Sequence, residues 1–152
     1  MCTIVDKKAT KEYRNKLKKT GGKGHAWKLV RVVDKDFVAP FQKKTVYNRT
    51  RPNKISHNTP FRRYDWGLSI NSSSLGTIIT DGVFHCCMTR KVARLIQKFG
   101  INLRDCKIVK VIFDMTDIVT VGKNHPDDVR IWNLDPKQNE VVCVTKFRFM
   151  EK

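Results

Sequence analysis

The feature that most constrains the fold is a succession of short apolar runs, each ended by turn-forming residues. Residues 25–33, "HAWKLVRVV", alternate between two sets of side chains as a strand does, and Asp34-Lys35-Asp36 then turns the chain. Asp81-Gly82 interrupts the run at 76–87, which predicts two strands joined as a hairpin. Further strands are predicted over 106–115 and 117–122, and a final hairpin over 129–134 and 140–149 around Asp135-Pro136. The chain has 152 residues, 40% of them hydrophobic, so we predict a small, strand-rich and mostly antiparallel α+β fold.

Two helices are predicted among these strands. The first is short and basic and covers residues 6–20, with Asp6 or Thr10 as its N-cap and Gly21-Gly22 as its stop. Its apolar stripe is thin, so it needs another surface to pack on. The second helix follows a Thr89 cap and ends at Gly100, where Ile101 supplies the contact that follows a glycine C-cap. Its apolar face is predicted to hold Val92, Ala93, Leu95, Ile96 and Phe99.

Positive charge is concentrated in the first part of the chain. The whole sequence has 31 Lys and Arg against 14 Asp and Glu, a net charge of +17. Residues 1–64 hold 18 basic and 4 acidic residues, whereas residues 65–152 hold 13 and 10. We therefore divide the chain into a basic N-terminal half, 1–64, and a compact α+β module, 65–152. The excess in one part predicts a positive surface for nucleic acid, an anionic membrane surface or an acidic protein.

The most basic segment is "NRTRPNKISHNTPFRRYDW", residues 48–66. It follows the short edge-strand pieces 37–41 and 45–47, and it holds five Lys or Arg and three aromatic residues, with no acid before Asp65. Loops of this length are functional or disordered. Guanidinium groups bind phosphates through paired hydrogen bonds, and aromatic rings stack on bases. A solvated loop is the alternative. The predicted polyanion-binding residues are Arg49, Arg51, Lys54, Arg62, Arg63, Tyr64 and Trp66, together with Lys18, Lys19, Lys23, Lys43 and Lys44.

Three other motifs have a simpler structural interpretation. "KKTGGKGH", 18–25, resembles a phosphate loop, but no Lys is followed by Ser or Thr and no strand precedes it, which favours a hinge. "VFHCC", 83–87, favours core thiols, with a zinc site of His85, Cys87, Cys106 or Cys143 as the alternative. "NHPDD", 124–128, favours a loop, with a divalent cation on His125, Asp127 and Asp128 as the alternative. We predict no cofactor.

The cysteines and the N-terminus indicate the compartment. The five cysteines are odd in number and two are adjacent, which favours reduced, buried thiols over a disulfide framework. The N-terminus is polar and basic without the apolar segment of a secretory signal, and no window approaches 18 apolar residues. We therefore expect cytoplasmic synthesis, in a host cell or a virion if the protein is viral, without secretion or a membrane span.

Residues 66–134 resemble small phage and giant-virus domains. The likeness rests on "TDGVFHCCMTRKVARLI" and the later "IVKVIFD" and "DIVTVG", in which a strand end leads into a helix with an inward Ala. The positions are Gly82, Phe84, His85, Ala93 and Gly122. The resemblance implies a viral protein but carries no activity.

The middle of this segment is also similar to ADP-ribosyltransferase domains. That similarity implies roles for Arg31, for Phe84 or His85, and for Glu140, although the usual middle motif of that family is absent.

These observations favour a non-enzymatic protein that binds a polyanion, above all nucleic acid, without strong sequence specificity. One alternative is a structural protein of a virion or other particle, whose basic half docks on other protein chains. The other is an enzyme acting on a nucleotide-like substrate with His85 and Glu140 in its site. Composition does not separate the first two, because phosphate-rich and carboxylate-rich partners both select Lys and Arg.

Overall fold

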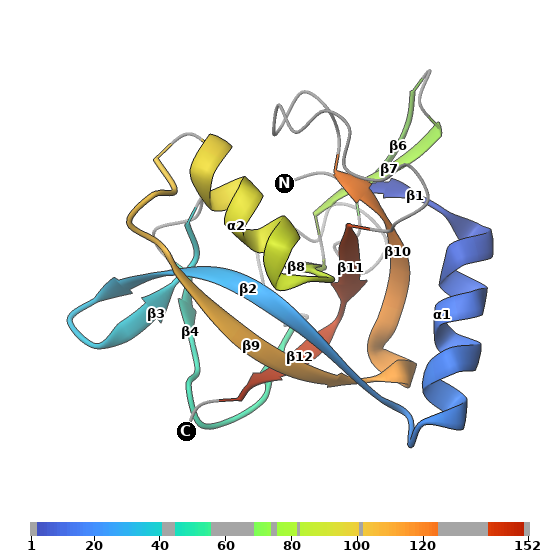
Figure 1. The fold of residues 1–152 in the computed structure, drawn as a ribbon, viewed down its shortest axis with the longest axis horizontal. Coiled ribbons are helices and arrows are strands. Elements are labelled where there is room, and N and C mark those ends of the chain that lie inside the picture. The colour runs from blue at the N-terminus through green and yellow to red at the C-terminus, as the bar shows by residue number, and fades with distance from the viewer. Residues whose placement is uncertain are drawn as a thin grey trace.

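The computed structural model describes residues 3–40, 45–55, 69–73, 76–81, 83–100, 102–124 and 140–150. They form one strand-rich antiparallel sheet with two α-helices, which confirms the predicted α+β class (Figure 1). The strands of the main path occur in the order β5-β12-β9-β2-β8-β11-β10-β1-β7-β6, and β3 and β4 extend it from β2. Their bounds are β1 Thr3–Val5, β2 Lys23–Val33, β3 Asp36–Val38, β4 Val46–Tyr47, β5 Asn53–Lys54, β6 Ser69–Ser73, β7 Gly76–Asp81, β8 Phe84–Cys87, β9 Lys107–Asp114, β10 Ile118–Asn124, β11 Val141–Val144 and β12 Lys146–Phe149.

The longest pairing joins β2 to β9 and positions the candidate site. Residues from Lys23↔Asp114 to Val30↔Lys107 pair along the two strands. On the other side of β9, Arg148 of β12 pairs with Ile112, and Lys146 in turn pairs with Lys54 of β5. Four strands thus lie side by side in a fixed register, which decides which side chains become neighbours.

The sheet bends where β2 meets β8. Only Trp27 and Cys87 pair there, after which β8, β11 and β10 continue the sheet. A single residue, Thr145, separates β11 from β12, and its amide donates to the carbonyl of Asp117 at 2.9 Å. The last apolar run is therefore not one strand of a hairpin, as the sequence suggested, but two strands with different partners.

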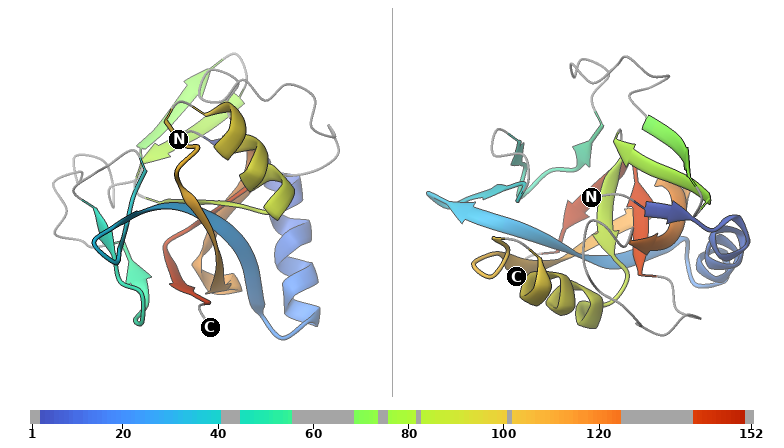
Figure 2. Two further views of the ribbon diagram at one scale, coloured as in Figure 1. Left: turned by 60° about the vertical axis from the view of Figure 1, so that its left-hand side comes forward. Right: turned by 90° about the horizontal axis from the view of Figure 1, so that it is seen from above.

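One core lies inside the bend. It combines side chains from both predicted parts of the chain, because β1, α1 and β2 of the first 64 residues are built into the same sheet as the strands that follow. The largest fully buried members include Phe37, Val30, Val111, Val144 and Phe147. Figure 2 shows the two helices against different parts of the sheet: α1 contributes Leu17 to this core, whereas α2 covers a separate apolar cluster that includes Leu29 and Cys87.

The N-terminal helix, α1 (Lys7–Lys19), has the predicted Asp6 cap, and its apolar stripe of Ala9, Tyr13 and Leu17 faces the core. The Asp6 carboxylate accepts a hydrogen bond from the Ala9 amide at 2.9 Å, and Leu17 is buried. Thr10 has another role, because its hydroxyl lies 3.0 Å from that of Thr120 and ties α1 to β10. This contact supplies the packing surface that the thin apolar stripe requires.

The second helix, α2 (Arg90–Phe99), also begins as predicted, with the Thr89 hydroxyl accepting from the Val92 amide at 3.2 Å. Two details differ. Phe99 is 54% exposed and does not join the apolar face. Gly100 has φ −71° and ψ 148°, which is extended and not left-handed. Glycine is needed there because a Cβ atom would lie 2.6 Å from the backbone carbonyl oxygen of Ile96 and 2.3 Å from the Leu103 side chain.

The predicted hairpin around Asp81-Gly82 is wrong. β7 pairs with β1 and β6, whereas β8 pairs with β2 and β11. Both edges of β8 are occupied by distant strands, so long-range pairing overrides the local turn signal. The basic loop also contains an unpredicted short strand, β5, whereas the predicted strand at 129–134 lies outside the described residues.

Candidate nucleic-acid interface

An open, basic face is formed by the outward side chains of β2, β9, β12 and β5. Successive outward positions on one strand are about 6.8 Å apart, and neighbouring strands about 4.8 Å. The register therefore arranges the outward side chains in rows, with inward neighbours such as Ala26, Val111 and Phe147 buried beneath them. We call this set the open face; its residues are Lys23, His25, Trp27, Lys54, Lys110, Ile112, Asp114, Lys146, Arg148 and Met150.

Cations dominate the open face. Its five Lys and Arg residues accompany one carboxylate, that of Asp114, which lies 3.0 Å from the Lys23 amine. Hydrogen bonds from the Thr116 backbone amide, the Lys23 amine and the Thr116 hydroxyl lower the pKa of Asp114 to about 2, so this group stays ionised. Lys54, Lys110 and Arg148 are exposed and have no salt bridge among the described residues.

Aromatic and apolar groups lie between these cations. Trp27 is half-buried, and the Lys110 amine lies 5.6 Å from the centre of its ring. His25 is exposed, Ile112 is half-buried and Met150 is 42% exposed. A sheet that presents basic and aromatic side chains together can contact both the phosphates and the bases of a nucleic acid.

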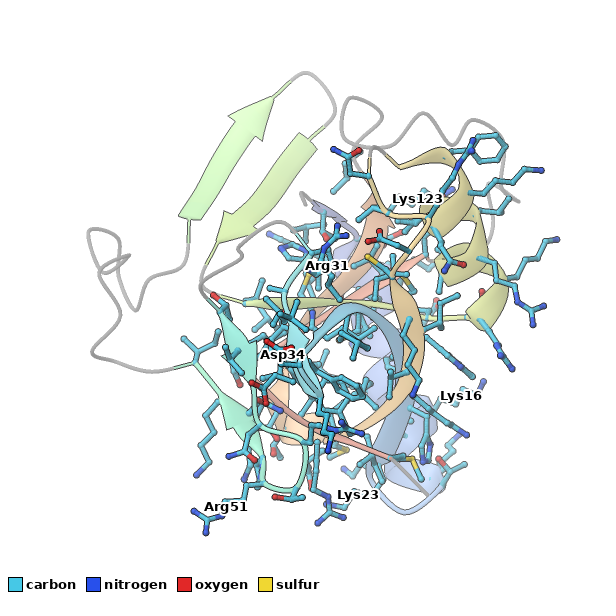
Figure 3. The ribbon with its side chains drawn as sticks, turned by 90° about the vertical axis from the view of Figure 1, so that its left-hand side faces the viewer. Lys16, Lys23, Arg31, Asp34, Arg51 and Lys123 are labelled. Atoms are coloured by element: carbon cyan, nitrogen blue, oxygen red, sulfur yellow. The ribbon has the colours of Figure 1, made fainter. Side chains whose placement is uncertain are left out.

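A depression of 390 Å³ lies at one end of the open face. Lys23, Asp114, Lys146 and Arg148 line it, together with Pro52 from the segment before β5. Lys23 and Arg51 both extend from this end of the molecule (Figure 3). The depression therefore joins the sheet surface to part of the predicted basic loop.

The predicted polyanion-binding residues are in different situations. Arg51, Lys54, Lys18, Lys19 and Lys23 are exposed. Arg49 instead stabilises the fold, because its guanidinium donates to the Lys35 carbonyl at 2.6 Å and lies 4.1 Å from the centre of the Phe37 ring. The remaining predicted residues, Lys43, Lys44, Arg62, Arg63, Tyr64 and Trp66, lie outside the described residues.

The residues of the predicted enzymatic alternative lie on different segments: Arg31 on β2, His85 on β8 and Glu140 directly before β11. Arg31 donates to Asp105 at 2.5 Å and to the Asn102 carbonyl at 2.6 Å, both on the segment after α2. Nδ1 of His85 lies 2.8 Å from the Thr3 hydroxyl and 3.4 Å from the Cys143 thiol, on β1 and β11. Glu140 is buried, and its backbone links Gly122 to Met88.

The cysteine side chains near His85 are poor nucleophiles. Cys86, Cys87, Cys106 and Cys143 are free and buried, as predicted. Burial raises the pKa of Cys87 and of Cys143 to about 12, so their thiolates are scarce at neutral pH. The Cys143 thiol therefore meets the His85 ring as a neutral group and not as an activated nucleophile.

No cluster of three or more His, Cys, Asp or Glu suitable for a metal ion occurs among the residues that the structure describes. The four zinc ligands of the alternative interpretation, His85, Cys87, Cys106 and Cys143, are among the described residues and do not form such a cluster. The alternative cation site at His125, Asp127 and Asp128 lies outside those residues and stays a prediction. In the described parts of the chain, the helices are too short or too polar to cross a membrane.

Comparisons with protein-family models, with curated proteins and with solved structures find no match to this chain. The resemblances to viral domains and to ADP-ribosyltransferases, and the viral origin that the first implies, therefore stay predictions.

Most of the open face could not be located from the sequence. Alternation in residues 25–33 does place Trp27 and Arg31 on the same side of a strand. That pattern does not reveal that Lys110 and Arg148 are its neighbours, because they come from segments more than 80 residues away. Only the register of β2, β9 and β12 brings them together.

Proposed function

We propose that the protein binds nucleic acid through the open face, chiefly by contacts to phosphates and without strong sequence specificity. The observation that carries this proposal is the register of four strands, which gathers five cations and one carboxylate in rows on the face that also presents Trp27. Basic side chains in fixed rows suit a chain of regularly spaced phosphates.

The energetic basis is the release of counterions. Each phosphate that a cation neutralises on duplex DNA makes the log-log slope of affinity against salt steeper by about 0.9, and on a single strand by about 0.7. A face with three or four unpaired cations therefore predicts strongly salt-dependent binding. The cations of the open face stand on strands or next to them and none is on a helix, so the proposed contacts go to phosphates and not to base edges in a groove.

The test must separate the open face from the general charge of a +17 protein. Fluorescence anisotropy of labelled RNA, single-stranded DNA and duplex DNA, each at two salt concentrations, compares two triple variants. The face variant is K110A/K146A/R148A. The matched control is K7A/K8A/K11A, which removes the same charge from exposed positions of α1 that are not among the predicted binding residues, and where alanine favours the helix.

We expect the face variant to bind at least tenfold more weakly, with a salt slope flatter by about 2 to 3. The control should lose less than about threefold, through long-range electrostatics alone. Equal losses in the two variants would show that net charge and not the open face governs binding. A larger loss in the control would move the site to α1.

A second function, docking on other protein chains in an assembly, is favoured by one observation. The arm made by β3, β4 and the end of β2 exposes Val33 and Val46, by 46% and 57%. The pairing places both valines on the same side of the arm. Sedimentation of wild type and V33S/V46S over a range of concentrations tests this function; assembly of the wild type that the variant loses would support it.

A further inference from the structure

We infer that the open face is built for single-stranded nucleic acid, with Trp27 as its base-stacking surface. This inference rests on the proposed function and names its ligand class. It follows from what surrounds Trp27, from the apolar centre of the face, and from the way each form of nucleic acid presents its bases.

Trp27 is held in place by the apolar cluster that α2 covers. One part of its ring packs against the cluster beneath α2, which includes Leu29, Cys87 and Ala93. The remainder stays accessible on the open face, beside the exposed His25 two residues earlier on the same strand. A ring that is fixed on one side and accessible on the other loses little conformational freedom when a base stacks on it.

Lys110 is the cross-strand partner of Trp27, and its amine lies 5.6 Å from the ring centre. A phosphate bound by this amine would lie next to a base stacked on the ring. The neighbouring row holds His25, Ile112 and Arg148, which repeats the combination of a flat ring, an apolar group and a cation. The next row holds the cations Lys23 and Lys146 on either side of Asp114.

The two forms of nucleic acid would use this arrangement differently. A duplex keeps its bases stacked inside and offers phosphates to a sheet surface, so Trp27, Ile112 and Met150 would be covered without a base to contact. A single strand exposes the faces of its bases, and stacking on aromatic side chains adds to phosphate binding irrespective of sequence. The mixed composition of the face therefore favours the single strand.

The experiment uses the full chain with Trp66 and Trp132 changed to Phe, so that Trp27 is the only tryptophan. The probes are oligothymidylate and a duplex of equal length, followed by tryptophan fluorescence and by anisotropy. W27L then removes the ring but retains an apolar group against α2. F99L is the matched control, because Phe99 is exposed and Lys98 lies 5.3 Å from its ring centre in a similar cation–ring contact away from the sheet.

We expect oligothymidylate to quench Trp27 and to bind more tightly than the duplex. W27L should weaken single-strand binding by about 5- to 100-fold without changing the salt slope, because no charge is lost. Duplex binding and the F99L variant should stay within about twofold of the parent. Salt-dependent binding that does not distinguish the two forms and does not respond to W27L would overturn this inference but leave the proposed function standing. Absence of salt-dependent binding to either form would overturn both.

Discussion

A lysine amine lies next to aromatic rings on each face of the sheet at β2, but one amine is buried and the other is open to solvent. On the inner face, Lys28 is 7% exposed, and its amine lies 5.3, 5.7 and 5.6 Å from the ring centres of Tyr47, Phe84 and Phe147. On the outer face, Lys110 of the adjacent strand is exposed and contacts Trp27.

The amine of the inner lysine, Lys28, has its hydrogen-bond acceptor within the protein. This amine donates to the His85 carbonyl at 3.1 Å. Burial acts to lower the pKa of Lys28, whereas its electrostatic interactions with Tyr47 and Cys86 and its hydrogen bond with Tyr47 act to raise it. A side chain enclosed in this way is shielded from a ligand in solution. The outer lysine has one aromatic neighbour and open solvent, which is what a binding surface requires.

The largest expected difference between the two lysines is in chemical reactivity. Acetylation of the native protein with an amine-reactive reagent, followed by peptide mass spectrometry, should modify Lys110 readily and leave Lys28 almost unmodified. Bound nucleic acid should protect Lys110 and leave the exposed lysines at the start of α1, such as Lys7, unprotected. Rapid modification of Lys28 without unfolding would contradict the closed inner face.

Substitution of Lys28 should affect stability and not binding. K28A removes the buried stem, its contacts with three aromatic rings and its hydrogen bond to the His85 carbonyl, which we expect to lower the free energy of unfolding by about 2 to 4 kcal/mol. K28M keeps most of the volume, and replacement of a buried charge by an apolar group should cost less than about 1.5 kcal/mol. Urea denaturation measures both. A K28M variant that is stable but binds nucleic acid poorly would contradict the claim that Lys28 contributes to stability and not to binding.

A smaller effect is expected from the one carboxylate of the open face. D114N keeps an oxygen to accept from the Thr116 amide, frees Lys23 and removes a negative charge, so nucleic-acid affinity should rise by about two- to fourfold. The pKa of Asp114 is about 2, so its carboxylate is charged at neutral pH and is protonated only as the pH falls toward that value. The difference between D114N and wild type should therefore be the same at pH 4.5 and pH 7 in anisotropy titrations. Weaker binding by D114N would contradict phosphate contact at this end of the face.

The sequence was sufficient to predict local structure, but it was insufficient to predict which strands lie side by side in the sheet. Both helices could be predicted because their caps, Asp6 and Thr89, act within three residues. The hairpin at Asp81-Gly82 failed because β8 has distant partners, β2 and β11, on both edges, while β7 pairs with the distant β1 and with the preceding strand β6. The candidate site was only partly predicted for the same reason: Lys23 and Lys54 were identified from local charge, whereas Lys110 and Arg148 join them through strand register.

The most direct test of the central claim is a map of the bound surface. Amide resonances of isotope-labelled protein, recorded while oligothymidylate is added, would locate the contact residue by residue. The account predicts that the largest shifts fall on residues 23–27 of β2, 110–114 of β9 and 146–150 at β12, with small shifts on α1. Shifts confined to α1 or to residues 56–66 of the basic loop would contradict the open face as the binding site.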